Sequence, residues 1–253
     1  MGKKLSFTCV PASRAVPADL VIVAVKSTGL TEALDTHEKI CIDPDTVILS
    51  VMNGISSEEI IGGRYGAEHM IYAVAQGMDA MKFGSTLTYS KMGVLCIGAR
   101  LESQQEGLDR ICCLFDKNRT SLCTGKEFSP SLEQVYAECR REQTCMVYSC
   151  TYGDVWHPGK ERDTMIGAMR EVIAVANAEG IDLSESDLEE YDRIIRTLRA
   201  DGTPSMGQDR IARRHSEVEM FAGTVIRRGQ KAGIPTPINQ WLYDQVQEIE
   251  KSY

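Results

Sequence analysis

Several features of membrane, secreted and nucleic-acid-binding proteins are missing from this chain. No apolar run approaches the roughly 20 residues that a membrane-spanning helix needs, and the opening MGKKLSFTCV lacks the apolar core of a signal peptide. Acidic residues outnumber Lys and Arg by 36 to 28, which gives a formal net charge of -8 without any long basic run. We therefore expect a cytoplasmic protein that binds neither a membrane nor nucleic acid.

The cysteines lack the spacing of metal ligands. There are nine, an odd number, and those in the middle of the chain show no C-x-x-C pair and no nearby His: Cys112, Cys113, Cys139, Cys145 and Cys150. We expect reduced thiols, several of them serving as small apolar side chains, and no bound metal. With 253 residues and 43% hydrophobic content, the chain is long enough for one large or two ordinary globular domains.

The N-terminal half shows a βαβ pattern. The run LVIVAVK, residues 20–26, reads as a buried strand, residues 28–40 have loose helical spacing, and TVILSVMNG, residues 46–54, is a second strand. Parallel strands joined by a crossover helix bind ligands beyond their carboxyl ends. Lys26 and Asn53 lie at those ends, so we expect both to face one crevice. Lys26 also fits a solvated strand end, and Asn53 with the glycine after it also fits a turn.

Three more elements follow before the middle of the chain. A serine caps a helix over residues 58–66, residues 70–78 form a strand, and residues 86–98 form a hairpin that turns at 91–93. The glycines of the predicted helix terminate it. They do not form the strand, G-x-G-x-x-G turn and helix with which a dinucleotide-binding sheet normally opens, and the sequence contains no such turn.

The C-terminal half changes to helical periodicity. Residues 161–179 carry one apolar face and end at Gly180, and residues 184–200 continue as a helix with a capping serine. The boundary between the two halves falls between about residues 100 and 145.

The run from Ser205 to Asn239 has the most specific pattern in the chain. Ser216 and Glu219 have S-x-x-E spacing, which predicts a capping box and places Glu217 in the first turn of a helix, beside unpaired N–H groups. Gly233 and the two prolines after it end that helix, and Asn239 is a candidate cap for a last helix. A capping role is the plainer interpretation of Ser205, and a first-turn carboxylate that of Glu217.

Taken together, these residues resemble ketopantoate reductases, also called 2-dehydropantoate 2-reductases. The family shows S-M-x-Q-D, H-[ST]-E and G-[IV]-x-[TV]-P at the spacing seen here, and V-A-V-K and N-G in the first half. The resemblance implies an α/β fold, a partial Rossmann-like parallel sheet lacking its first βαβ unit, followed by an all-α C-terminal domain. It implies reduction of a small keto acid, 2-dehydropantoate, to pantoate with NADP as the cofactor. It assigns substrate binding to Asn53, Ser205 and Glu217, and cofactor binding to Lys26 and Asn53.

The resemblance breaks off over residues 119–142. There the family carries a helix like W-x-K-F-x-x-N-x-x-x-N, whose Lys acts as general acid, and this chain has no match to that Lys. Codons permitted for LEQVYAECRRE, residues 132–142, read one base later give WSKFMLNVGVN, so a frame slip is one hypothesis for this segment. Coding DNA that cannot yield the Lys and Asn in the shifted frame would reject it. We expect a partial nucleotide-binding domain at residues 1–118, an aberrant linker at 119–142 and a helical substrate and dimerisation domain at 143–253.

The sequence is compatible with three functions. The first is a ketopantoate reductase with impaired activity. The alternatives are a catalytically inactive remnant that packs or binds a partner, and a reductase of another 2-keto acid. His215 is a weaker candidate for the acid, because a polar residue just before a helix cap is usually solvated. An uncovered sheet edge predicts self-association, and a homodimer is a possible assembly.

Overall fold

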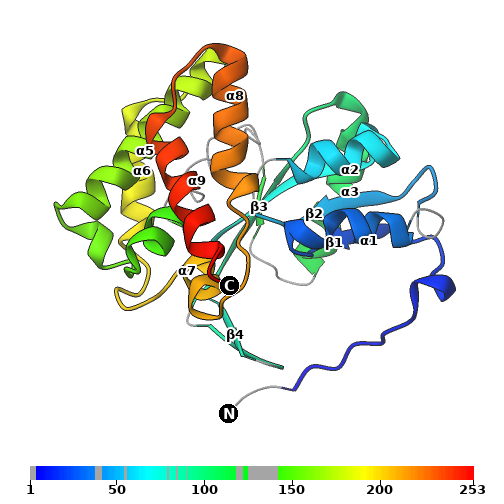
Figure 1. The fold of residues 1–253 in the computed structure, drawn as a ribbon. Helices are drawn as coiled ribbons and strands as arrows, with labels where there is room; N and C mark the ends of the chain where they lie inside the picture. Colours follow the sequence, from blue (N-terminus) through cyan, green and yellow to red (C-terminus); the bar gives the residue numbers. More distant parts are fainter. Residues whose placement is uncertain are drawn as a thin grey trace.

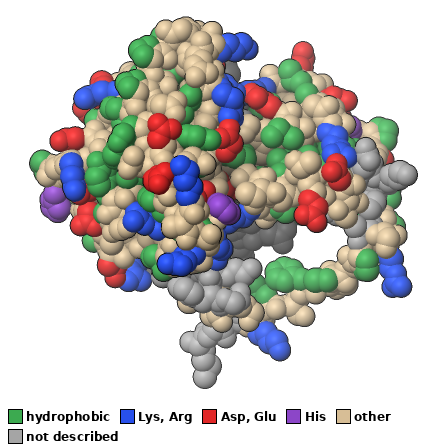
Figure 2. Space-filling view, in the orientation of Figure 1, with side chains coloured by type: hydrophobic (Ala, Val, Ile, Leu, Met, Phe, Trp, Pro, Cys, Tyr) green, Lys and Arg blue, Asp and Glu red, His purple; other side chains and the backbone are tan. Residues whose placement is uncertain are grey.

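The computed structural model describes residues 4–37, 42–53, 56–78, 80–83, 85–89, 91–117, 122–124 and 142–253. Most of the segment 119–142, with its frame-slip hypothesis, therefore lies outside the described residues. Figure 1 shows two halves side by side, a sheet with its helices in the first half of the chain and a bundle of helices in the second. The N-terminal stretch extends away from the sheet, and Figure 2 shows acidic and basic side chains interspersed over the helical half.

The main sheet has the strand order β1-β2-β3-β6-β7. Strands β1 (Leu20–Val23), β2 (Val47–Ser50) and β3 (Met70–Met78) run parallel, β6 (Met92–Gly98) pairs antiparallel with β3, and β7 (Leu122–Cys123) is parallel to β6. This arrangement confirms the predicted α/β class, a partial Rossmann-like sheet followed by an all-α domain. Strand β7 adds residues 122–123, from the predicted linker segment, to the sheet.

Helices cover both faces of this sheet because its central strands are apolar on both sides. On one face, α1 (Leu30–His37) and α2 (Ser57–Tyr65) bury Ile48 of β2. On the other face, α3 (Gln105–Lys117) packs Leu108 and Ile111 against Val47 and Leu49. Successive residues of a strand point to opposite faces, so the unbroken apolar run of β2 is explained by helices on both sides.

Several sequence predictions in this half are wrong. The first strand was predicted to be buried, but none of its residues is, and Gly62 and Gly63 lie within α2 instead of ending it. The first strand ends at Val23, three residues before Lys26, and Lys26 adopts an extended conformation ahead of the 3-10 turn η2 (Ser27–Gly29). Residues 86–98 do not form a hairpin, because β5 (Thr86–Thr88) pairs with β4 (Met81–Phe83) while β6 pairs with β3. The remaining short turns are η1 (Ala12–Arg14), η3 (Ala67–His69) and η4 (Glu102–Gln104).

The second half is helical, as predicted. A helical stretch at residues 142–148 and the turn η5 (Asp154–Trp156) lead into a long helix. The helices that follow are α5 (Lys160–Ala178), α6 (Glu185–Ile195), α7 (Ser205–Ile211), the π-helical turn η6 (Glu219–Gly223), α8 (Thr224–Ala232) and α9 (Pro237–Glu250). Gly180 and Gly233 end α5 and α8 in the left-handed region, with φ of 84° and 72°, which confirms both predicted stops.

Two predicted helix caps, Ser216 and Asn239, are wrong. The backbone and side-chain donors of both residues bind carboxylates that are distant in sequence. The backbone N–H and the hydroxyl of Ser216 both donate to Glu250, at 2.7 and 2.6 Å, so no capping box forms with Glu219. Asn239 lies inside α9, and its N–H and side-chain amide donate to Glu171, at 2.9 and 2.6 Å. Within the described residues, no helix is long and apolar enough to cross a membrane, and no cluster of three potential metal ligands is found.

Candidate functional site

The candidate site begins at the carboxyl edge of β1 and β2. The register of these parallel strands pairs Val23 with Ser50, and the backbone N–H of Val51 donates to the carbonyl of Val23 at 2.9 Å. Lys26 and Asn53 each lie three residues past the paired positions (23 to 26 and 50 to 53). Both are exposed. The structure therefore brings the two predicted residues to the same edge of the sheet, where ligands of such sheets bind.

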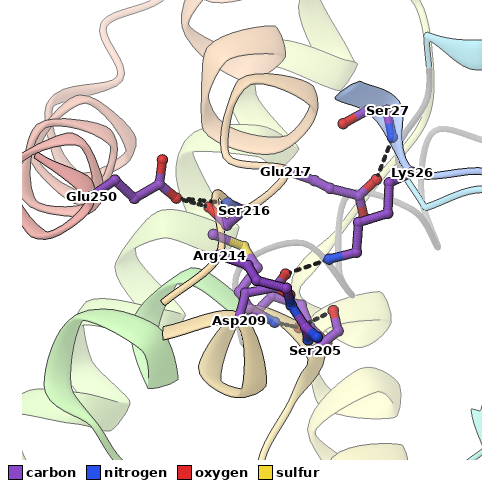
Figure 3. Close-up of polar contacts among 10 residues, drawn as sticks. Lys26, Ser27, Ser205, Asp209, Arg214, Ser216, Glu217 and Glu250 are labelled. Carbon is purple, nitrogen blue, oxygen red and sulfur yellow. Dashed lines mark hydrogen bonds and ion pairs between the residues drawn. The ribbon is translucent and has the colours of Figure 1, made fainter. Parts of the chain in front are cut away.

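Lys26 joins this edge to the helical half through a buried carboxylate. Its Nζ lies 2.6 Å from Asp209 Oδ2, and Arg214 Nε lies 3.0 Å from the other oxygen, Oδ1. The side chain of Asp209 is 2% exposed, whereas those of Lys26 and Arg214 are about half exposed. A buried carboxylate is stable only with such partners, so the two cations offset the cost of removing Asp209 from water. Figure 3 shows the three side chains meeting.

Glu217 makes the second link between the halves. Its Oε1 accepts a hydrogen bond of 2.9 Å from the backbone N–H of Ser27, the residue after Lys26. Glu217 is buried, at 7% exposure, so its carboxylate lies between the two halves and not on the outer surface. The glutamate and the lysine thus lie close together although 190 residues separate Ser27 from Glu217.

The residues before Glu217 point elsewhere. The hydroxyl of Ser216 donates to Glu250, and His215 Nδ1 lies 3.1 Å from the other oxygen of the same carboxylate. The ring of His215 is 70% exposed and packs near Tyr253, with centroids 6.0 Å apart. Glu250 therefore anchors this turn to the end of α9, and His215 faces that end of the helix.

Ser205 contacts a carboxylate of its own half. Its hydroxyl donates to Glu142 Oε2 at 2.7 Å, and the N–H of Met206 donates to the same oxygen at 2.9 Å. Ser205 is the first residue of α7, so Glu142 occupies the donors at that helix end. Ser205 and Asp209 are four residues apart in one helix and lie on the same face.

The loop that carries Asn53 is held by a buried polar chain. Ser50 and Ser57 hydroxyls lie 2.9 Å apart, and Ser57 donates to Glu58 Oε2 at 2.7 Å. Burial raises the pKa of the Glu58 carboxyl, and the Ser57 hydrogen bond and the charge of Arg100 only partly oppose this. The two ends of the loop, at β2 and α2, are thus fixed by the same chain of hydrogen bonds.

Sequence reasoning named Lys26, Ser205 and Glu217 but missed three charged groups: Asp209, which pairs with Lys26, Arg214, which pairs with Asp209, and Glu142, which accepts from Ser205. Asp209 lies within the S-M-x-Q-D motif, so the motif itself was the available signal. Arg214 and Glu142 carried no local signal, because their partners lie elsewhere in the chain. Asn53 is placed at the edge of the sheet, and Ser205 one helical turn from Asp209.

Comparisons with known proteins agree over nearly the whole chain. The family model described as Ketopantoate reductase PanE/ApbA matches residues 3–99, and the model of the C-terminal part of the same family matches residues 131–250. The second match begins inside the segment 119–142. A 2-dehydropantoate 2-reductase of Shigella flexneri is 32% identical over 238 residues, which are 93% of this chain and 76% of that protein. One of Streptococcus pyogenes is 23% identical, covering 95% of this chain and 78% of that protein.

Solved structures give the same fold. A 2-dehydropantoate 2-reductase from Geobacter metallireducens aligns with a TM-score of 0.83 at 21% identity, covering 94% of this chain and 79% of the other. A D-mandelate dehydrogenase with NADH and anilino(oxo)acetate aligns with a TM-score of 0.83 at 20% identity, covering 95% and 79%. Because two family models together span both halves, and a curated relative is 32% identical, the chain belongs to the ketopantoate reductase family.

Proposed function

We propose that this chain is an oxidoreductase of the ketopantoate reductase type, whose keto acid lies between the edge of the sheet and the helical half. The observation that carries the proposal is the pair of links between the halves, Lys26 to Asp209 and Ser27 to Glu217. They gather a cation and a buried carboxylate at the carboxyl edge of parallel strands. That is where ligands of this class of sheet bind.

The proposed substrate is 2-dehydropantoate, which carries a keto group, a carboxylate and a hydroxyl. Asn53 offers an amide donor and acceptor, and Ser205 a hydroxyl. Glu217 offers a buried acceptor for the substrate hydroxyl. Reduction of the ketone places negative charge on its oxygen, so the ammonium of Lys26 at this edge favours the charged transition state. We assign no general acid, because the family lysine has no match in this sequence and residues 125–141 lie outside the described part.

The proposed cofactor is NADP, which supplies the hydride when bound. The described residues fit one part of it, since Lys26 and Asn53 lie at the strand edge where a nicotinamide nucleotide binds. They do not offer the glycine turn that holds a pyrophosphate, because β1 is followed by Lys26 in an extended conformation and then a 3-10 turn. We therefore expect the 253 residues alone to bind NADPH weakly and to turn over slowly.

An inactive remnant is the second candidate, favoured by the contacts of Glu142. This carboxylate takes the hydroxyl of Ser205, which we propose as a donor to the substrate, and the N–H of Met206. Glu142 is the last residue of the segment 119–142, for which we retain the frame-slip hypothesis. Coding DNA for residues 119–142 that cannot encode Lys and Asn one base later would reject the slip and favour the remnant.

A reductase of another 2-keto acid is the third candidate. The D-mandelate dehydrogenase neighbour, whose structure holds NADH and anilino(oxo)acetate, has the same fold, so this fold also occurs in an enzyme named for another acid. Comparing 2-dehydropantoate with other 2-keto acids as substrates separates the two assignments. A preference for another acid would replace the substrate and leave the site unchanged.

The division of the chain and its assembly are also proposals. We propose a partial nucleotide-binding domain at residues 1–118, a linker at 119–142 and a substrate and dimerisation domain at 143–253. One solved neighbour is a dimeric ketopantoate reductase from Staphylococcus aureus, which supports a homodimer. A cytoplasmic location accords with a role in pantothenate synthesis.

Ligand-observed NMR with 2-dehydropantoate tests the site without requiring turnover. Glu217→Gln keeps an oxygen for the N–H of Ser27 but removes the charge, so we expect Kd to rise by about tenfold or more. Glu219→Gln is the matched control, because Glu219 is exposed and contacts Arg227 and Tyr243. Equal Kd values for both variants and the unchanged protein would reject the assignment of Glu217.

A further inference from the structure

The helical stretch at residues 142–148 ends in a specific backbone turn. Ser149 has a φ of 53°, in the left-handed region, and its N–H donates to the carbonyl of Met146 at 3.4 Å. The N–H of Cys150 donates to the carbonyl of Cys145 at 3.1 Å. These two hydrogen bonds, with a left-handed residue between them, define a Schellman motif. A contact between the side chains three residues before and two residues after the helix end frequently accompanies this motif.

Those two positions are Cys145 and Cys150 here. Both side chains are thiols and belong to the same buried cluster, with exposures of 0% and 9%. The Cys145 thiol donates to the carbonyl of Thr151 at 3.8 Å, so it points toward the residues just beyond the helix. In its thiolate form Cys150 can accept the Cys145 hydrogen in place of the Thr151 carbonyl, and this lowers the pKa of the Cys150 thiol. The turn thus places the two thiols in the same buried cluster.

We propose that Cys145 and Cys150 are a redox-active pair that closes to a disulfide across the end of this helix. The backbone turn places the two side chains in one buried cluster at the end of the helix, and proximity of this kind is the first requirement for a disulfide. This modification site is independent of the keto-acid site, since neither cysteine contacts Lys26, Asp209 or Glu217 among the described interactions.

Hydrogen peroxide oxidises the pair in two steps. The Cys150 thiolate attacks the peroxide, its sulfur is oxidised to sulfenic acid, and one oxygen of the peroxide leaves as water after protonation. The Cys145 thiol then attacks the sulfenic sulfur, the S–S bond forms, and the hydroxyl leaves as a second water. Cys150 is the residue to react first, because it is the more exposed of the two and its pKa is lowered.

A second pair of cysteines in the same chain is a built-in control. Cys112 and Cys113 are adjacent in α3, and neighbouring residues of a helix point in different directions. Burial raises the pKa of the Cys112 thiol, with Asp109 and Asp116 adding to the effect. This pair is closer in sequence but is not placed for a disulfide.

Peptide mapping after mild oxidation tests the proposal directly. The folded chain is treated with hydrogen peroxide, its remaining thiols are alkylated after unfolding, and trypsin is added. The tryptic peptide from Glu142 to Lys160 contains Cys145 and Cys150 and no other cysteine, and the peptide from Ile111 to Lys117 contains only the control pair. We expect the first peptide to carry no alkyl group and to be two hydrogen atoms lighter than its reduced, unalkylated form, reversibly with dithiothreitol, while the second stays fully alkylated.

Three outcomes would overturn the proposal. One is full alkylation of Cys145 and Cys150 at a peroxide dose that oxidises the exposed Cys9. Another is Cys150 carrying sulfinic acid while Cys145 stays alkylated. The third concerns the variants Cys150→Ala and Cys145→Ala. In each variant the remaining cysteine has lost its partner, so after oxidation and reduction it should be alkylated to the same extent as in the unoxidised variant. A disulfide between that cysteine and another part of the chain, found both in the variant and in the unchanged protein, would contradict the pairing.

Discussion

The first strand of the sheet and the helical half differ in how completely they are covered. In the helical half, Ile195 and Leu242 have 0% exposure. In β1, Ile22 is 52% exposed, and in the stretch before it Phe7 is 80% exposed. The apolar residues of one region are enclosed by their neighbours, whereas those of the other face solvent on one side.

Strands β1 and β2 show that neighbours, not residue types, cause this difference. Both are four-residue apolar strands, LVIV and VILS, yet every residue of β2 is buried and none of β1 is. Strand β2 pairs with β1 and β3, whereas β1 pairs among the described strands only with β2. The exposed edge of β1 is therefore a product of its place in the sheet, and such an edge favours pairing with another chain.

The largest effect is expected from an isoleucine in the covered region. Ile195→Ala removes a fully buried side chain and should lower the free energy of unfolding by about 2–5 kcal/mol. Ile22→Ala, the same change on the half-exposed strand, should lower it by less than about 1 kcal/mol. Urea unfolding of both variants measures the difference. Equal losses would mean that β1 is as well covered as the helical core.

A smaller loss of stability is expected from removing the ion pair between the sheet and the helical half. Lys26→Met leaves Asp209 buried with Arg214 as its only described cation. We expect a loss of about 1–2 kcal/mol, less than for a fully buried pair because Lys26 is half exposed and screened by solvent. Lys251→Met, which removes an exposed pair with Glu248, is the control and should leave the urea midpoint unchanged. An unchanged midpoint for both variants would show that the ion pair between Lys26 and Asp209 contributes nothing to stability.

The stability of the fold against urea should depend on pH through the protonation of Glu58 in the sheet half. Its folded pKa is raised above the ordinary 4.5, so the folded state binds more protons than the unfolded state in the interval between the two values. The favourable contribution of protonated Glu58 is present below pH 4.5 and is lost as pH rises toward the folded pKa. Glu58→Gln should remove this decline and keep the Ser57 hydrogen bond. Urea midpoints measured upward from pH 4.5 check it, and a decline as steep in Glu58→Gln as in the unchanged protein would contradict the assignment.

The smallest effect on stability is expected from a charge on the exposed edge. Ile22→Lys places an ammonium where the side chain is already half exposed, so the urea midpoint should barely move. Self-association, however, should decrease, because charged side chains on an edge strand hinder pairing with another chain. Size-exclusion chromatography over a range of concentrations measures this. Unchanged elution of an associating chain would place its contact on another surface.

Local patterns in the sequence predicted most of the elements. The strand at residues 70–78 and the helix beginning near residue 160 follow from apolar periodicity, and Gly233 from its place after the last periodic residue. Lys26 and Asn53 were placed at one edge because parallel strands align their carboxyl ends. These inferences depend on neighbours in sequence or on a general rule of sheet topology.

The errors came from partners that are distant in sequence. Ser216 bonds to Glu250 instead of capping its own helix, because a buried carboxylate 34 residues away takes both of its donors. Strand β6 pairs with β3 and not with the nearer β5, and Asp209 meets Lys26 across 183 residues. A local pattern shows that a group needs a partner but not which distant residue supplies it.

The central claim is that one keto acid contacts both the edge of the sheet and the helical half. A crystal structure of the chain grown with saturating 2-dehydropantoate tests it most directly. We predict electron density for the keto acid between Asn53 and Glu217, with Ser205 released from Glu142. Density for the ligand at another place, or a structure in which Asn53 and Glu217 line no common cleft, would contradict the account.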